Sequence, residues 1–176
     1  MYDAPVDRAA ELRLPTVVVP VRLCLIGQAP RDAELFVADV APRGKAQLLD
    51  ALAEQLDASA AFVPARVGGA VRLLGARAIA WIAVGRAEEL PDELALYDRQ
   101  HRVSIELLHG PALEGLLLDN SPADRPRVID HLNRPGLFVR LWTADEQVLV
   151  NKQQIMAVAE LDPPGEPLGD PPGDPR

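Results

Sequence analysis

The sequence has little sulfur and few aromatic rings. Its 176 residues include one cysteine, Cys24, and aromatic residues make up only 4% of the chain. One cysteine excludes an intrachain disulfide and any metal site built from several cysteines. Because Cys24 lies in a run that predicts a strand, we expect it to be a small buried apolar residue rather than a nucleophile.

The features of exported and membrane proteins are also missing. Nowhere do 18 apolar residues follow one another, and the first residues combine no basic region with an apolar stretch. The single cysteine fits a reducing compartment. We therefore expect a soluble, cytoplasmic protein with no membrane partner.

The sequence contains no basic cluster. The formal net charge is −8, and two segments, residues 85–100 and 161–176, carry −3 each. The rest of the chain is close to neutral, so the overall charge is only a weak argument against nucleic acid. The absence of clustered Lys and Arg is a stronger argument.

Motifs for catalysis and metal binding are missing as well. His101, His109 and His131 form no H-x-x-x-H or H-E-x-x-H spacing, and the glycines Gly110 and Gly115 lack the Lys-Ser/Thr of a phosphate-binding loop. No serine stands in a G-x-S-x-G context. We therefore expect no enzyme, no cofactor and no metal.

What the later part of the chain does contain is a series of short strands. Residues 102–109 alternate apolar and polar side chains, which is the period of a strand with one buried face. Val128, Ile129 and Leu132 recur at helical spacing and predict a short helix. The predicted elements are strands at 102–109 and 112–118, a short helix within 122–133, and strands at 137–143, 147–150 and 154–158.

An earlier stretch, residues 21–84, matches this pattern at two constant offsets. Such self-similarity at a fixed spacing predicts an internal duplication. The matched pairs at the first offset include Glu34 with Glu114, Leu49 with Ile129, Asp50 with Asp130 and Leu52 with Leu132. The pairs at the second offset are Phe62 with Phe138, Val63 with Val139, Leu73 with Leu149, Ile79 with Ile155 and Ile82 with Val158.

Two motifs lie at the ends of the later copy. They read V-x-I-x-L-x-H-G-x-x-L-x-G-x-L from Val103 to Leu117 and V-L-V-N-K-x-x-I-x-x-V from Val148 to Val158. Both resemble Sm-like small β-barrels, which open with a bent hairpin and close with a strand, a tight turn and a last strand. The middle departs from that pattern, because a helical turn is inserted at Val128. The combination R-x-x-D-x-L-N from Arg127 to Asn133 is also similar to a bacterial small-barrel family of unknown function, which implies a fold and no activity.

The predicted fold is therefore mainly β with short helices, arranged as two tandem small β-barrel modules of the Sm-like or SH3-like kind. The modules are expected at residues 20–84 and 101–161. Residues 1–19 are expected to form a lead-in with an edge strand, and residues 85–100 to form a connector. Residues 162–176, rich in Pro, Gly and acidic side chains, predict a disordered tail.

Few residues are candidates for a site. The resemblance to Sm-like proteins places Asn151, Lys152 and Gln153 at a turn that meets single-stranded RNA in that family, although a purely structural polar turn is the preferred interpretation. The matched aspartates are expected to cap turns rather than to catalyse. The residues predicted to be structural and matched between the copies are Asp50, Asp130, Phe62 and Phe138.

We therefore expect a non-enzymatic interaction or scaffold protein that self-associates or docks a protein partner through strand edges or apolar surface. The less favoured alternative is an Sm-like RNA-binding protein that uses the turn at Asn151 and Lys152, because aromatic stacking platforms are scarce. A third alternative is a small-molecule sensor with a pocket between the modules.

Overall fold

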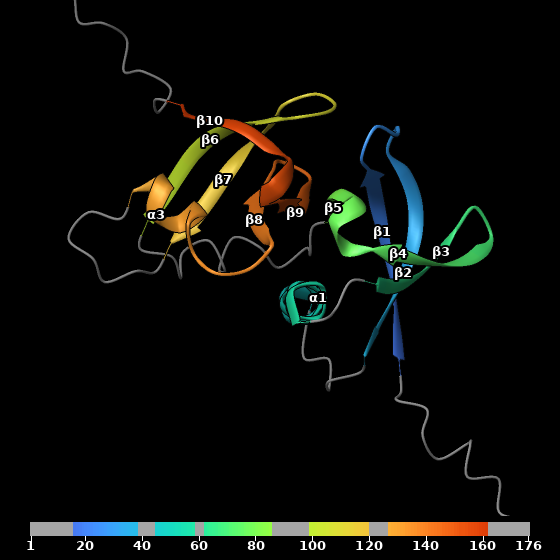
Figure 1. Ribbon diagram of the computed structural model, residues 1–176. Coiled ribbons are helices and arrows are strands. Elements are labelled where there is room, and N and C mark those ends of the chain that lie inside the picture. The colour runs from blue at the N-terminus through green and yellow to red at the C-terminus, as the bar shows by residue number, and fades with distance from the viewer. Residues whose placement is uncertain (1–15, 39–44, 59–61, 86–98, 120–126, 162–176) are drawn as a thin grey trace, which may run out of the picture.

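The computed structural model describes residues 16–38, 45–58, 62–85, 99–119 and 127–161 (Figure 1). The predicted disordered tail, most of the lead-in and most of the connector lie outside the described residues. Residues 16–19, expected to form a separate edge strand, are instead the beginning of a longer first strand.

The first half of the chain forms five strands and a long helix. A short 3-10 helix, η1, lies between its last two strands. The elements are β1 (Thr16–Leu25), β2 (Arg31–Ala38), α1 (Lys45–Ala58), β3 (Phe62–Val67), β4 (Ala70–Gly75), η1 (Ala76–Ala78) and β5 (Ile79–Gly85).

The second half contains the same kinds of element in the same order. Each strand and the short helix predicted from the sequence are confirmed to within a few residues. The elements are β6 (Arg99–Leu107), β7 (Leu113–Asp119), α3 (Val128–Leu132), β8 (Phe138–Trp142), β9 (Glu146–Asn151), η2 (Lys152–Gln154) and β10 (Ile155–Glu160).

The ten strands in the described part of the chain belong to one open antiparallel sheet, in the order β10-β6-β7-β8-β9-β5-β1-β2-β3-β4. The prediction of a mainly β fold with short helices is confirmed. The finer prediction of two tandem small β-barrel modules differs from the structure, in which the described strands form one open sheet and β5 pairs with β9 of the other half. That pairing, which we call the β5–β9 joint, uses the strand edges that closure of each half would have needed.

The joint leaves β5 buried on both faces. One face of the strand, with Ile79, Ile82 and Val84, belongs to the core of the first half. The other face, with Ala80, Trp81 and Ala83, belongs to the core of the second half. Consistent with that position, Ile79 to Val84 is a continuous run of apolar residues without a polar side chain.

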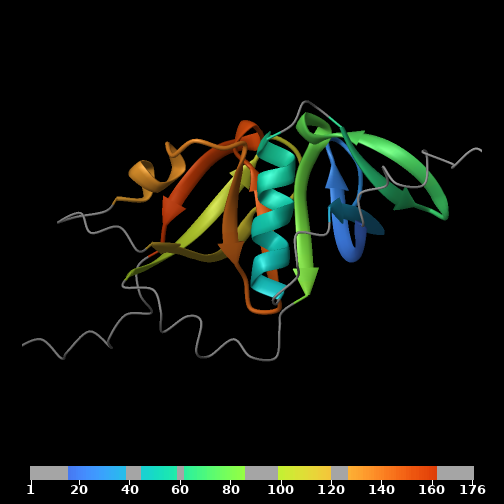
Figure 2. The same cartoon turned by 90° about the horizontal axis from the view of Figure 1, so that it is seen from below.

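Helix α1 covers the joint. Leu49, Leu52 and Leu56 recur at helical spacing and are buried in the first core. The helix contacts β2 and β3 of its own half and also β8 of the other half. Figure 2 shows it lying between β5 and the strands of the second half. Two side chains of the second half, Phe138 and Leu149, accordingly lie in the core of the first half.

The β3–β4 connection is the tight hairpin that its two glycines predict. Gly68 has φ 59° and Gly69 has φ 80°. Positive φ at both central residues is the geometry of the two-residue turn that matches the twist of paired strands. The turn therefore pairs β4 with β3, and β4 is the last strand at that end of the sheet.

We predict that Leu149→Ala lowers the free energy of unfolding by about 2–5 kcal/mol, because it leaves a cavity where the two halves meet. Leu149 is only 1% exposed. Urea unfolding in dilute solution measures the change. The matched control is Leu73→Ala at the counterpart position, which is 69% exposed, and its effect should stay within about 0.5 kcal/mol. Equal losses for the two variants would contradict this account of the joint.

Candidate functional site

The sheet ends in two strands that each have a single strand neighbour. Strand β4 pairs only with β3, and β10 pairs only with β6, among the described strands. Each edge therefore presents a row of backbone N–H and C=O groups to which no strand in the described part of the chain is paired. These two edges are the candidate site.

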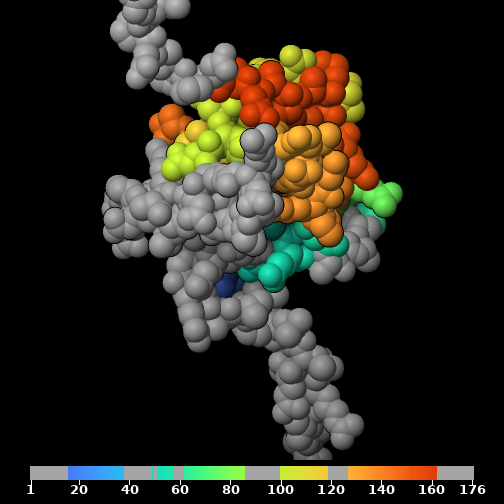
Figure 3. Space-filling view, turned by 90° about the vertical axis from the view of Figure 1, so that its left-hand side faces the viewer, coloured from blue at the N-terminus to red at the C-terminus, as the bar shows by residue number. Residues whose placement is uncertain are grey.

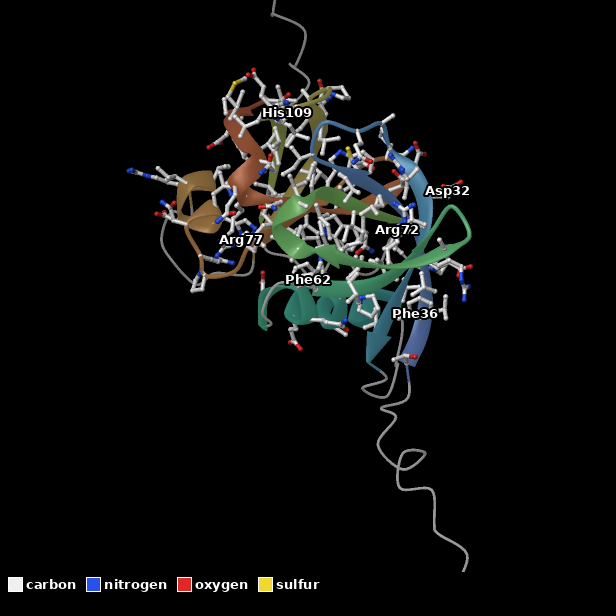
Figure 4. The ribbon with its side chains drawn as sticks, turned by 45° about the vertical axis from the view of Figure 1, so that its right-hand side comes forward. Asp32, Phe36, Phe62, Arg72, Arg77 and His109 are labelled. Atoms are coloured by element: carbon white, nitrogen blue, oxygen red, sulfur yellow. The ribbon has the colours of Figure 1, made fainter. Side chains whose placement is uncertain are left out.

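The β4 end, which we define as Phe62, Val71 and Leu73, exposes large apolar side chains. Their exposed fractions are 63%, 64% and 69%. Val71 lies opposite Arg66, Leu73 opposite Pro64 and Phe62 opposite Gly75, so the three side chains lie on one face of the β3–β4 hairpin. Figure 4 labels Phe62 and, on the same hairpin, Arg72. Of the two phenylalanines predicted to be structural, Phe138 is thus buried and Phe62 is not.

The β10 end, which we define as Ile129, Met156, Ala157 and Ala159, is the other apolar surface. Met156 is 61% exposed and Ile129 is 59% exposed. Both alanines are exposed as well. In the space-filling view of Figure 3 the residues of β10 lie beside the segment that contains α3. The two ends together hold five of the seven large exposed hydrophobic residues in the described part of the chain.

Between these ends, the side chain of Asn151 on β9 connects β9 to β5. Its side chain is fully buried, and its Nδ2 donates a hydrogen bond of 2.8 Å to the carbonyl oxygen of Ile79. Its Oδ1 accepts from the backbone N–H of Gln153 at 2.9 Å, which caps η2. Asn151 therefore has a structural role, and of the three residues predicted from the Sm-like resemblance only Lys152 and Gln153 reach the surface.

Lys152 lines a hollow of about 280 Å³ near the joint. Its Nζ donates to the carbonyl oxygen of Arg134 at 2.5 Å. Partial burial lowers the pKa of this ammonium group, and the Asp57 carboxylate opposes that shift. The other basic side chains around the hollow are His131, Arg134 and Arg140. This basic group could not be predicted from the sequence, because its members meet only through the fold.

The matched aspartates lie on the two helices, as predicted. Asp130 accepts a hydrogen bond from the backbone N–H of Arg127 at 3.3 Å, which is the capping contact expected of it. Asp50 lies within α1, and its side chain is outside the described residues. A third aspartate, Asp57 at the end of α1, accepts from the backbone N–H of Leu137 at 2.6 Å and so links the helix to the other half.

A larger hollow of about 650 Å³ lies beside the joint and is lined by side chains of both halves. Four of its five charged side chains form ion pairs, since Arg22 lies 2.5 Å from Glu146 across the joint and Arg66 pairs with Glu34, and the fifth is Asp32. This hollow is the place where the third alternative, a small-molecule sensor, would need its pocket. The two ion pairs neutralise four of the five charges that a ligand would meet in this hollow.

Cys24 is buried and its pKa is raised by burial, with Arg31 opposing the shift. Its Sγ lies 3.4 Å from the carbonyl oxygen of Gln28. These are the properties of the small buried apolar residue that the sequence predicts. Within the described part of the chain, no three His, Cys, Asp or Glu side chains gather in a way that would hold a metal ion. No described helix has the length and apolar character needed to cross a membrane.

Comparison with known proteins adds no relative. No protein-family model, curated protein or solved structure matches the chain. The candidate site therefore rests on the geometry of the sheet edges alone.

Asn151→Ala is expected to lower the free energy of unfolding by about 1–3 kcal/mol, because the buried Ile79 carbonyl loses its side-chain partner. The measurement is thermal or urea unfolding followed by circular dichroism. Gln153→Ala is the control, since that side chain is exposed and its loss should change stability by no more than about 0.5 kcal/mol. An Asn151→Ala protein as stable as the parent would show that the bond does not hold the joint.

Proposed function

We propose that the chain is a non-enzymatic interaction scaffold, built from two related β modules that share one sheet. In this proposal each open edge of the sheet docks an extended segment of a protein partner by strand addition. The backbone of the edge supplies hydrogen bonds, and the apolar side chains beside it supply specificity.

The relation between the two modules is supported by their order and their contacts. Strand, strand, helix, strand, strand, 3-10 helix and strand occur in sequence in each half. Within the sheet, β5-β1-β2-β3-β4 repeats the arrangement of β10-β6-β7-β8-β9. The resemblance of the module ends to Sm-like proteins also supports the proposed relation between the modules, and it implies no activity.

One observation supports docking at the edges: large apolar residues are exposed beside β4 and β10, whose outer edges pair with no described strand. Edge strands of monomeric proteins are usually protected by charged side chains, proline or a covering element. Strand β4 has one charge, Arg72, between the exposed Val71 and Leu73. Strand β10 has one charge, Glu160, at its last residue. Such weak protection fits edges that are covered by a partner.

RNA binding is the less favoured alternative. The hollow around Lys152 is basic, but Asn151 is buried and Lys152 is already hydrogen-bonded to the backbone. Both tryptophans, Trp81 and Trp142, are buried and offer no stacking platform.

The experiment is site-specific photocrosslinking of the full chain in cells of its source organism. A photoreactive residue replaces Leu73 at the β4 end or Met156 at the β10 end. The control position is Val18, which is 46% exposed, pairs with Phe36 of β2 and lies outside both β4 and β10. We expect protein adducts at the two edge positions and few at Val18, because only the edges dock a partner.

The mass of each adduct identifies what covers the edge. Protein adducts confined to positions 73 and 156 support the scaffold. Adducts with RNA concentrated near position 152 would support the alternative. Equal labelling at all positions, or none at the edges, would contradict docking by strand addition.

A further inference from the structure

We propose that the partner is a second copy of this chain, and that β10 of one copy adds antiparallel to β4 of the next. This inference rests on the proposed function and names its partner. It is carried by a comparison within the molecule. The β5–β9 joint already shows how the last strand of one module pairs with the fourth strand of the other.

The β4 end provides the fourth strand of the proposed contact. At the joint, Phe138 and Leu149 of the second half are buried in the core of the first half, with 8% and 1% of their surface exposed. Their matched residues in the first half are Phe62 and Leu73, which are 63% and 69% exposed. The chain therefore keeps the same apolar pair at the β4 end, where the described part of the molecule has no core to receive it.

The proposed contact also needs a core that receives this pair. At the joint it is formed in part by Leu49 and Leu52 of α1 and by Ile79 and Ile82 of β5, and all four are at most 2% exposed. Every matched residue in the second half is apolar but less buried. The matched residues are Ile129, which is 59% exposed, and the partly buried Leu132, Ile155 and Val158.

The outward face of the last strand is likewise apolar in both halves, but it is buried only in the first half. In β5, Ala80, Trp81 and Ala83 are at most 4% exposed because the second half covers them. At the matched positions of β10 stand Met156, Ala157 and Ala159, and all three are exposed. The β10 end thus matches the β5 side of the joint, and the β4 end matches the β9 side. Each end is apolar, and the strand that would pair with it is the one at the other end of the sheet.

The joint also fixes the register of the proposed contact. Trp81 is opposite Val150, Ile82 is opposite Leu149 and Ala83 is opposite Val148. Carried over to the matched positions, this places Ala157 opposite Leu74 of the next copy. The remaining pairs are Val158 with Leu73 and Ala159 with Arg72.

One difference makes the contact between chains weaker than the joint within a chain. The buried bond from Asn151 to Ile79 has no counterpart, because Gly75 stands at the position that matches Asn151. Helix α3 is also much shorter than α1 and covers less of its core. We therefore expect association that is reversible and depends on protein concentration.

The contact joins two different surfaces, so each chain keeps one open end after binding. Contacts of this head-to-tail kind continue until a ring closes or a filament grows. This polarity separates the proposal from a symmetric dimer, in which β4 would pair with β4 or β10 with β10.

Sedimentation of full-length variants tests the polarity. The β4-blocked variant carries Phe62→Glu and Leu73→Glu, and the β10-blocked variant carries Met156→Glu and Ala159→Glu. All four side chains are exposed, so both variants should keep the circular dichroism and unfolding transition of the parent. Val18→Glu is the control, since it adds charge to an exposed site away from both edges.

We expect the parent and Val18→Glu to form species of several chain masses as concentration rises. Each blocked variant alone should stay monomeric, and an equimolar mixture of the two should form a dimer and nothing larger. Only a head-to-tail contact gives this result, because the mixture contains one intact β10 edge and one intact β4 edge.

Other outcomes overturn the inference. A blocked variant that self-associates would indicate a symmetric contact. A parent that remains monomeric, while positions 73 and 156 crosslink to a different protein in cells, would remove the second copy and leave the scaffold function standing. A monomeric parent without edge adducts would remove both proposals.

Discussion

The burial of β5 on both faces is the constraint on which the rest of the structure depends. A strand placed between two cores must be apolar on both sides, and Ile79 to Val84 meets that condition. Its pairing with β9 joins the two halves into one sheet and gives Phe138 and Leu149 their place in the opposite core. Small modules of this size gain apolar burial by sharing a boundary in this way.

The same arrangement explains why the two ends of the sheet are apolar. The joint pairs the last strand of the first half with the fourth strand of the second half, so the last strand of the second half and the fourth strand of the first half remain at the two edges of the sheet. The retained edges are β10 and β4, and their exposed residues match buried residues at the joint. The proposed association between copies repeats this one contact.

Much of the fold could be predicted from local patterns. The period-2 run of residues 102–109 placed a strand, and the helical spacing of Val128, Ile129 and Leu132 indicated α3. The joint could not be predicted, since it pairs strands more than 60 residues apart. The apolar run of β5 did not single out that strand, because Ile155 to Ala159 of β10 is an unbroken apolar run as well. The role of Asn151 was hidden for the same reason, as its partner Ile79 is 72 residues away.

Native-state hydrogen exchange at two protein concentrations tests the central claim most directly. The account predicts that amides of β5 exchange only through global unfolding, whatever the concentration, because both of its neighbours hold it. Amides of β4 and β10 should exchange quickly in dilute solution and become protected together as concentration rises. Fast exchange in β5, or edge amides that stay unprotected in concentrated protein, would contradict it.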